Sequence, residues 1–153
     1  MNEEKTHNSE LNNTLLKYAE VEDNPKLIND IIIKGADINS ANSNGCNALH
    51  IATHQHNNTI VDILIELKAS LNNIDNEGNT ALHYAVLTKN RIAAVALIAV
   101  GANPNIKNHD NKTALKIAQD KHNYSMIKAL LPTATHKFKS FKKKNFYKNQ
   151  SSN

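Results

Sequence analysis

Apolar residues recur through the middle of the chain in short stretches, and polar segments separate them. The clearest stretches are LINDIIIKG, IVDILIELK and AAVALIAVG, in which apolar side chains fall three and four residues apart, as on one side of a helix. Shorter apolar stretches follow Asn47, Thr80 and Thr113, and the side chains of these three residues can cap a helix N-terminus. The pattern therefore predicts an all-α chain built from pairs of short helices joined by turns.

The same sequence words return at a fixed interval of 33 residues. The first word reads GCNALHIA, GNTALHYA and NKTALKIA in its three copies, which start at Gly45, Gly78 and Asn111. The second word reads GADIN, KASLN and GANPN, with starts at Gly35, Lys68 and Gly101. A single helical pair of this size buries too little surface to be stable alone, so we expect the copies to stack on one another.

This repeat resembles the ankyrin repeat, through its 33-residue period and its Thr-Ala-Leu-His and Gly-Ala-Asx-x-Asn words. The resemblance covers residues 8–131 and implies a solenoid of about four stacked helix-turn-helix repeats, at about 8–40, 41–73, 74–106 and 107–131. We expect a flexible N-terminus at residues 1–7 and a disordered basic tail at residues 132–153. The family implies a non-enzymatic module that binds another protein, and we expect the chain itself to be a monomer.

One departure from the family pattern lies in the turn between the two helices of each unit. The family has glycine there, and this chain has His56, Lys89 and His122. If these residues adopt a positive φ, each costs about 1 kcal/mol. Alternatively, the asparagine that follows each of them takes that conformation.

The segment NALHIATHQH, residues 47–56, holds three histidines that invite a metal-site interpretation. His50 and His54 are spaced as two ligands on one side of a helix, but His56 falls on the opposite side, and zinc needs three or four ligands. His50 recurs one period later as His83, and the resemblance implies a structural histidine that bonds backbone groups between units. We favour the structural role and predict no metal and no cofactor, with a metal bound at His50 and His54 as the less favoured alternative.

The sequence contains no catalytic motif that we recognise, such as a phosphate-binding glycine loop or a nucleophile elbow. Its four glycines all lie at repeat positions.

Cys46 is the only cysteine, so an internal disulfide is excluded and a reducing compartment is expected. The longest apolar run, Ile92–Val100, is too short to cross a bilayer. No secretory signal or lipidation motif is visible, and we therefore predict a cytoplasmic location, with delivery to a host cell or to the nucleus left open. From the absence of catalytic motifs we predict that the protein is not an enzyme.

Binding in the family commonly uses the concave surface, which loop tips and the exposed side of each first helix form. The residues that map to this surface are, from the second unit, Ala41, Ser43, Asn44, Cys46, His54 and Gln55; from the third, Ile74, Asn76, Glu77, Asn79, Leu87 and Thr88; and from the fourth, Lys107, His109, Asp110, Lys112, Asp120 and Lys121. Ile74 and Leu87 are the apolar candidates for an anchor. The alternative is a solvated surface without a preferred ligand.

The opposite, convex side carries an apolar stripe in one unit only. Ile92, Val95 and Ala99 lie on one side of a predicted helix, and the matching places one period earlier are Thr59, Asp62 and Glu66. The stripe indicates either a contact with a partner or a second copy, or a slightly apolar surface helix.

The charge of the chain is concentrated in its last 22 residues. The whole chain carries +4, and residues 132–153 contain six lysines and no acid, which leaves −2 for residues 1–131. The segment KFKSFKKKNFYK also holds every phenylalanine; its basic and aromatic residues are Lys137, Phe138, Lys139, Phe141, Lys142, Lys143, Lys144, Phe146, Tyr147 and Lys148. Such a segment is either a solvated tail or a binder of nucleic acid or an anionic membrane surface.

Overall fold

The computed structural model describes residues 2–21 and 25–131, and the predicted basic tail lies outside them. Eight α-helices and no β-strand occur in this part of the chain. The helices are α1 (Asn2–Glu20), α2 (Pro25–Ile33), α3 (Ala48–His54), α4 (Asn58–Glu66), α5 (Ala81–Leu87), α6 (Arg91–Ala99), α7 (Ala114–Asp120) and α8 (Tyr124–Leu130). None of these helices is long and apolar enough to cross a membrane.

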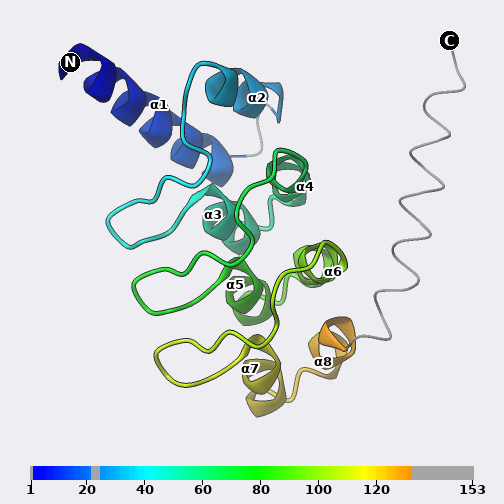
Figure 1. Ribbon diagram of the computed structural model, residues 1–153. Coiled ribbons are helices and arrows are strands. Elements are labelled where there is room, and N and C mark those ends of the chain that lie inside the picture. The colour runs from blue at the N-terminus through cyan, green and yellow to red at the C-terminus, as the bar shows by residue number, and fades with distance from the viewer. Residues whose placement is uncertain (1, 22–24, 132–153) are drawn as a thin grey trace, which may run out of the picture.

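The helices stack in two layers, as Figure 1 shows. Helices α1, α3, α5 and α7 form an inner layer in which each packs on the next, and α2, α4, α6 and α8 form an outer layer in the same way. The long loops that precede α3, α5 and α7 project from the inner layer, on the side away from the outer layer (Figure 1). This arrangement confirms the predicted all-α solenoid of stacked helical pairs.

Polar side chains at the starts of α3, α5 and α7 explain why these short helices begin where they do. The side chains of Asn47, Thr80 and Thr113 each accept a hydrogen bond from the backbone N–H three residues later. At Asn47 and Thr80 the histidine at that third position bonds back to the cap residue, which completes a capping box. A seven-residue helix is marginal in isolation, so these caps and the packing between units must both contribute.

Small and branched side chains alternate in the core between the two layers. Ala52, Ala85 and Ala118 are fully buried at equivalent places and let the helices of a pair approach closely. Leu64 of α4 and Leu97 of α6 are also fully buried and belong to the same hydrophobic core. The spacing of these residues along the sequence therefore predicted the buried side of each helix correctly.

The turns between paired helices contain non-glycine residues in a left-handed conformation. His56, Lys89 and His122 have φ of 61°, 62° and 51°, so the residue at the family's glycine position adopts the positive φ and the asparagine after it does not. Lys68 and Asn111 also have positive φ, at places where other units have glycine. At about 1 kcal/mol each, these residues make the array less stable than glycine at the same places would.

The N-terminal end differs from the sequence-based expectation. Helix α1 begins at Asn2, so residues 2–7, which we expected to be flexible, form part of a 19-residue helix. This helix is much longer than the seven-residue inner helices that follow it. Its side chains at Leu15, Leu16 and Ala19 are buried against the array, and Asn12 accepts a hydrogen bond from the N–H of Asp37. The longer helix thus covers the exposed end of the stack.

Candidate functional site

Each long loop is held by an Asn or Asp side chain that accepts hydrogen bonds from the backbone of its own loop. Asn42, Asp75 and Asn108 occupy equivalent places, and one oxygen of each accepts two N–H groups two and four residues later. Neighbouring loops are also bonded to each other: the N–H of Asn76 donates to the carbonyl of Asn44 at 3.0 Å, and that of His109 donates to Glu77 at 2.9 Å. The loop tips therefore form a continuous, ordered surface.

His50 and His83, which recur at the 33-residue interval, connect one unit to the next. The Nδ1 atom of His50 accepts a hydrogen bond from the N–H of Asn47, and its Nε2 lies 3.1 Å from the carbonyl oxygens of Asn73 and Asn79. His83 repeats the arrangement and donates from Nε2 to the carbonyl of Lys112 at 3.1 Å. Both nitrogens of His50 are thus engaged by backbone groups, which agrees with the structural role expected of this histidine.

Burial affects the protonation of both histidines. Desolvation lowers the pKa of His50 and of His83, and it outweighs the hydrogen bonds to backbone carbonyls, which act in the opposite direction. His54 and His56 are exposed. His56 nevertheless bonds the next unit, because its Nε2 lies 3.0 Å from the carbonyl oxygen of Thr88.

Tyr84 on α5 is the centre of a polar cluster that occurs once in the described residues. The equivalent places in the neighbouring units hold Ile51 and Ile117. The Tyr84 hydroxyl donates to Oδ2 of Asp75 at 2.8 Å and lies 3.4 Å from Sγ of Cys46. The rings of His50 and His54 both stand edge-on to the Tyr84 ring, with centroids 5.7 Å away.

Burial and hydrogen bonds within this cluster shift the pKa values of three of its titratable groups. Burial and the hydrogen bonds to Cys46 and Asp75 raise the pKa of Tyr84, so the phenol keeps its proton. Burial opposes ionisation of Asp75, but hydrogen bonds from Tyr84 and from the backbone of Asn79 and Glu77 prevail, and its pKa is lowered. Burial raises the pKa of the Cys46 thiol, which makes it a poor nucleophile.

Two hollows lie beside Tyr84, and we call them the Tyr84 hollows. The first, of about 190 Å³, is lined by Glu20, Asn42, Cys46, His50, Ile51, His54, Gln55 and Tyr84. The second, of about 260 Å³, is lined by Asn44, Cys46, Asp75, Asn76, Glu77 and Tyr84. The structure thus brings together six residues that the sequence placed on the concave surface: Asn44, Cys46, His54, Gln55, Asn76 and Glu77.

The sequence did not single out Tyr84, Asp75 or Glu20 for this surface. The signal for Tyr84 was present, because a tyrosine replaces isoleucine at one copy of an otherwise regular position. Asn79 requires a correction: it was expected on the binding surface, but it is only 3% exposed. Its side chain donates to Glu77 and accepts from Asn108, so it connects two loops and does not face solvent.

Two apolar side chains that are close in sequence to hollow-lining residues are exposed. Ile74 immediately precedes Asp75 and is 52% exposed, and Leu87 lies one helical turn beyond Tyr84 and is 40% exposed. Thr88 is half-buried, and its hydroxyl donates to the carbonyl of Tyr84. Ala41 and Ser43, also expected on this surface, are exposed on the preceding loop.

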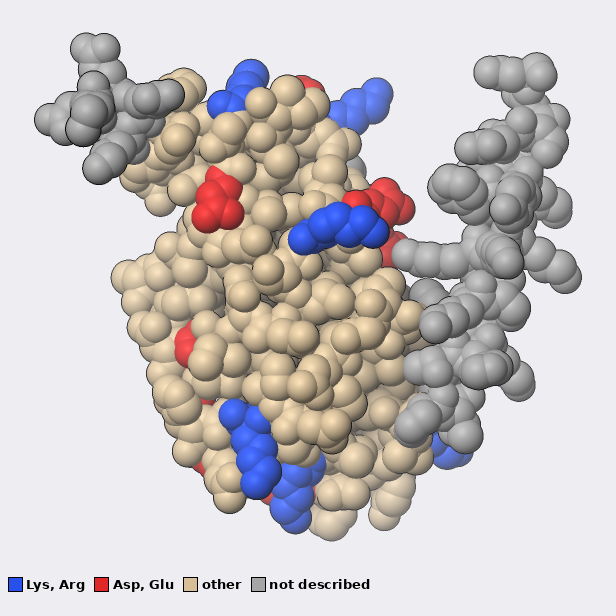
Figure 2. All heavy atoms as spheres, viewed as in Figure 1, with Lys and Arg blue, Asp and Glu red and all other residues tan. Residues whose placement is uncertain are grey.

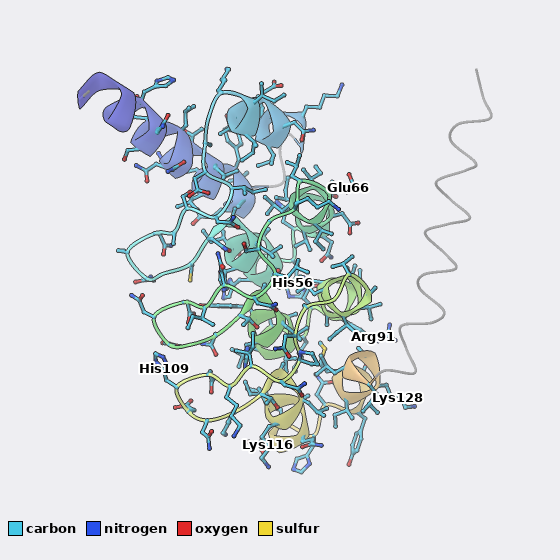
Figure 3. All side chains as sticks on the ribbon, in the orientation of Figure 1. His56, Glu66, Arg91, His109, Lys116 and Lys128 are labelled. Atoms are coloured by element: carbon cyan, nitrogen blue, oxygen red, sulfur yellow. The ribbon has the colours of Figure 1, made fainter. Side chains whose placement is uncertain are left out.

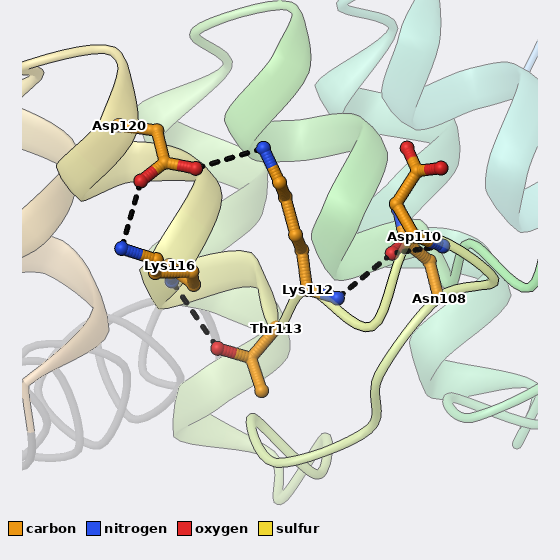
Figure 4. Close-up of polar contacts among 6 residues, drawn as sticks. All are labelled: Asn108, Asp110, Lys112, Thr113, Lys116 and Asp120. Atoms are coloured by element: carbon orange, nitrogen blue, oxygen red, sulfur yellow. Dashed lines mark hydrogen bonds and ion pairs between the residues drawn. The ribbon is translucent and has the colours of Figure 1, made fainter.

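The last unit presents charged side chains on this surface. The carboxylate of Asp120 pairs with Lys112 at 2.8 Å and with Lys116 at 2.9 Å, as Figure 4 shows. The hydrogen bond and charge of Asp120 raise the pKa of Lys112, and the two lysines lower that of Asp120. His109 lies at the tip of the adjacent loop (Figure 3). The remaining predicted residues of this unit, Lys107, Asp110 and Lys121, are exposed.

On the convex side the apolar stripe is confined to α6. Ile92 is 63% exposed, and Val95 and Ala99 are half-buried. Figure 3 places Glu66, Arg91 and Lys128 on the same outer layer of helices. Charged side chains are scattered over the face shown in Figure 2, with wide stretches between them that carry none. The predicted convex contact stays a prediction.

Comparison with known proteins agrees with the observed architecture. A family model described as "Ankyrin repeats (3 copies)" matches residues 15–108, which is more than half of the 153-residue chain. No curated protein matches the chain.

Proposed function

The chain belongs to the ankyrin repeat family, and from this we propose that it is a non-catalytic module that binds a protein partner through its concave surface. Ankyrin repeats are generally protein–protein interaction modules. An extended stack offers a long surface on which a partner contacts several units at once. The exposed surface residues determine which partner binds, whereas the residues at repeat positions determine the fold.

The observation that carries the proposal is the exposure of Ile74 and Leu87, which lie close in sequence to Asp75 and Tyr84 of the Tyr84 hollows. An aromatic wall, two exposed apolar side chains and hollows large enough for a side chain are features of the centre of a protein interface. They lie on the two units whose loops and helices are bonded together by His50 and by the Asn44–Asn76 contact. A surface held in this way loses little conformational entropy on binding.

The chemistry of the cluster favours binding over catalysis. Asp75 is occupied as the acceptor for its own loop and for Tyr84, and the Cys46 thiol is protonated. A general base or a nucleophile needs a free lone pair directed at a substrate. These groups instead fix the position of the Tyr84 ring.

The test is an affinity capture with the full chain and two matched variants. Replacement of Ile74 and Leu87 together by Glu places two charges on the concave surface, whereas Ile92→Glu places one such charge on the convex surface. We expect the first variant to lose the captured partner and Ile92→Glu to retain it, with unchanged thermal unfolding in both. Loss in Ile92→Glu and retention in the concave variant would reverse the assignment.

The tail supports a second candidate function, in which its lysines bind nucleic acid or an anionic membrane surface. The observation is its sequence: six lysines interleaved with all three phenylalanines of the chain. Replacement of Lys142, Lys143 and Lys144 by Ser in the full chain should abolish salt-sensitive binding to phosphatidylserine vesicles or single-stranded RNA. Ile92→Glu, on the convex surface, should bind them as the original chain does, and loss in Ile92→Glu with retention in the lysine variant would refute this candidate.

A further inference from the structure

The Tyr84 hollows carry negative charge without a matching positive charge in their walls. Glu20 lines the first hollow, and Asp75 and Glu77 line the second. Neither lysine nor arginine is among the described residues that line them. Lys112 and Lys116 of the last unit are already paired with Asp120. The hollows therefore favour a cationic side chain.

The ring of Tyr84 adds a second reason for a cation. It forms a wall of both hollows, and a Lys ammonium close to the face of a tyrosine is attracted by the ring quadrupole. Its hydroxyl is fixed by Asp75, so the ring does not have to be ordered when a ligand arrives. Ile74 and Leu87 provide exposed apolar surface next to the hollows for an aromatic or aliphatic neighbour of that cation.

The chain contains one segment of the complementary chemistry. Residues 137–148 carry six lysines, three phenylalanines and a tyrosine, and no acidic residue. The net charge of residues 132–153 is +6, against −2 for the rest of the chain. The rest of the chain thus has the opposite sign to this segment.

The segment is long enough to reach the hollows. It follows Leu131 at the end of α8, and α8 packs on α7, which packs on the α5 helix of Tyr84. Two helix-to-helix spacings amount to about 20 Å, since packed helix axes lie about 8–10 Å apart. Lys142 is eleven residues beyond Leu131, and an extended chain of that length spans about 36 Å.

We propose that the Tyr84 hollows are a binding site for a lysine-rich, aromatic segment, and that their occupant is the chain's own segment 137–148. The inference rests on the proposed function, because the segment covers the same concave surface that binds the partner. The lysines lie close to Glu77, Asp75 and Glu20, and the aromatic residues lie on Leu87 and Ile74. A partner then has to displace the segment, which makes its binding weaker and dependent on salt.

Carbodiimide cross-linking of the full chain tests the site directly, because the reagent joins a lysine amine to a carboxylate only where the two are in contact. The monomeric product is digested and the linked residues are identified by mass spectrometry. We expect links from residues 137–148 to Glu77 and Glu20, and fewer to the exposed acids Glu10 and Glu66. High salt should reduce the links to Glu77 and Glu20, because ionic screening weakens the attraction.

Two variants separate this site from a general attraction between charges. Tyr84→Ile introduces the residue that the neighbouring units have at this place, and Glu77→Gln removes one exposed charge. Each should lower the links to Glu20 by about threefold, the effect of losing one partly exposed contact. Glu66→Gln on the outer layer removes the same charge as Glu77→Gln and should leave the links to Glu20 unchanged.

Three outcomes would overturn the proposal. Links spread evenly over Glu10, Glu66, Glu77 and Glu20 would show a non-specific attraction. Links found only in the covalent dimer would assign the segment to a second copy of the chain. Links to Glu20 that are unaffected by both Tyr84→Ile and Glu77→Gln would place the segment elsewhere. None of these outcomes affects the test of partner capture at Ile74 and Leu87. The proposed function and this inference can therefore be refuted independently of each other.

Discussion

Replacement of Lys89 by Gly should stabilise the protein, although it removes a side chain. Lys89 has a φ of 62° in the turn between α5 and α6, and its side chain is exposed. A residue with a Cβ costs about 1–2 kcal/mol in this conformation, because the Cβ approaches its own carbonyl oxygen. Glycine removes that cost but adds about 0.4–1 kcal/mol of conformational entropy to the unfolded chain. The net expectation is a gain of about 1 kcal/mol in the free energy of unfolding.

Urea denaturation followed by circular dichroism measures this gain. A stability change that leaves the surface exposed on unfolding unaltered raises the urea midpoint and leaves the slope unchanged. A change of about 1 kcal/mol also raises the melting temperature by about 4 °C in a domain of this size. The turn keeps its backbone bonds, in which the N–H of Lys89 donates to Val86 and its carbonyl accepts from Arg91.

Lys121→Gly is the matched control. Lys121 is also exposed and ends an inner helix, but its φ is −88°, so glycine relieves no strain there. We expect a loss of about 0.5–1 kcal/mol, the entropic cost of glycine alone. The reasoning is refuted if Lys89→Gly has a urea midpoint at or below that of the original chain, or if Lys121→Gly stabilises it equally.

Two further predictions concern the contacts between units. The pKa values of His50 and His83 are lowered by folding, so the unfolded chain binds more protons just below its histidine pKa of about 6.5. The urea midpoint should therefore decrease as the pH is lowered from about 7.5 to about 5.5. A midpoint that stays constant or increases over this change would contradict the role of these rings. Asn90→Ala removes both a cap to Ala93 and a bond to the carbonyl of Thr53, whereas Asn123→Ala removes only a cap. Asn90→Ala should cost about 1 kcal/mol more than Asn123→Ala in thermal unfolding, and equal losses would show that the inter-unit bond contributes nothing.

The sequence predicted those features that recur in each unit. The helical pairs, the packing of Ala52, Ala85 and Ala118 and the structural role of His50 all follow from equivalent residues in successive copies. A repeated residue in a stacked array has the same surroundings each time, so one interpretation explains all its copies.

The features that sequence reasoning missed depend on single residues. The Tyr84 hollows exist because one unit has a tyrosine beside an aspartate, and only the folded chain shows that the two are 2.8 Å apart. Asn79 was misplaced because its side chain bonds to that of Asn108 in the next loop, a contact that only the folded chain shows. The length of α1 lies outside the repeat pattern, and no second copy indicated it.

The hydrogen bonds between successive loops have a consequence for how the array can grow. The Asn44–Asn76 and Glu77–His109 contacts use backbone groups at equivalent places. Each loop therefore offers a carbonyl to the loop that follows it and an N–H to the loop that precedes it. A duplicated unit inserted after residue 73 would meet matching groups at both seams, and the recognition surface would lengthen by one loop without a new interface having to evolve. Changes in the size of a bound partner are therefore open to this protein by gene duplication within the repeat, a route closed to folds whose core is shared by all their elements.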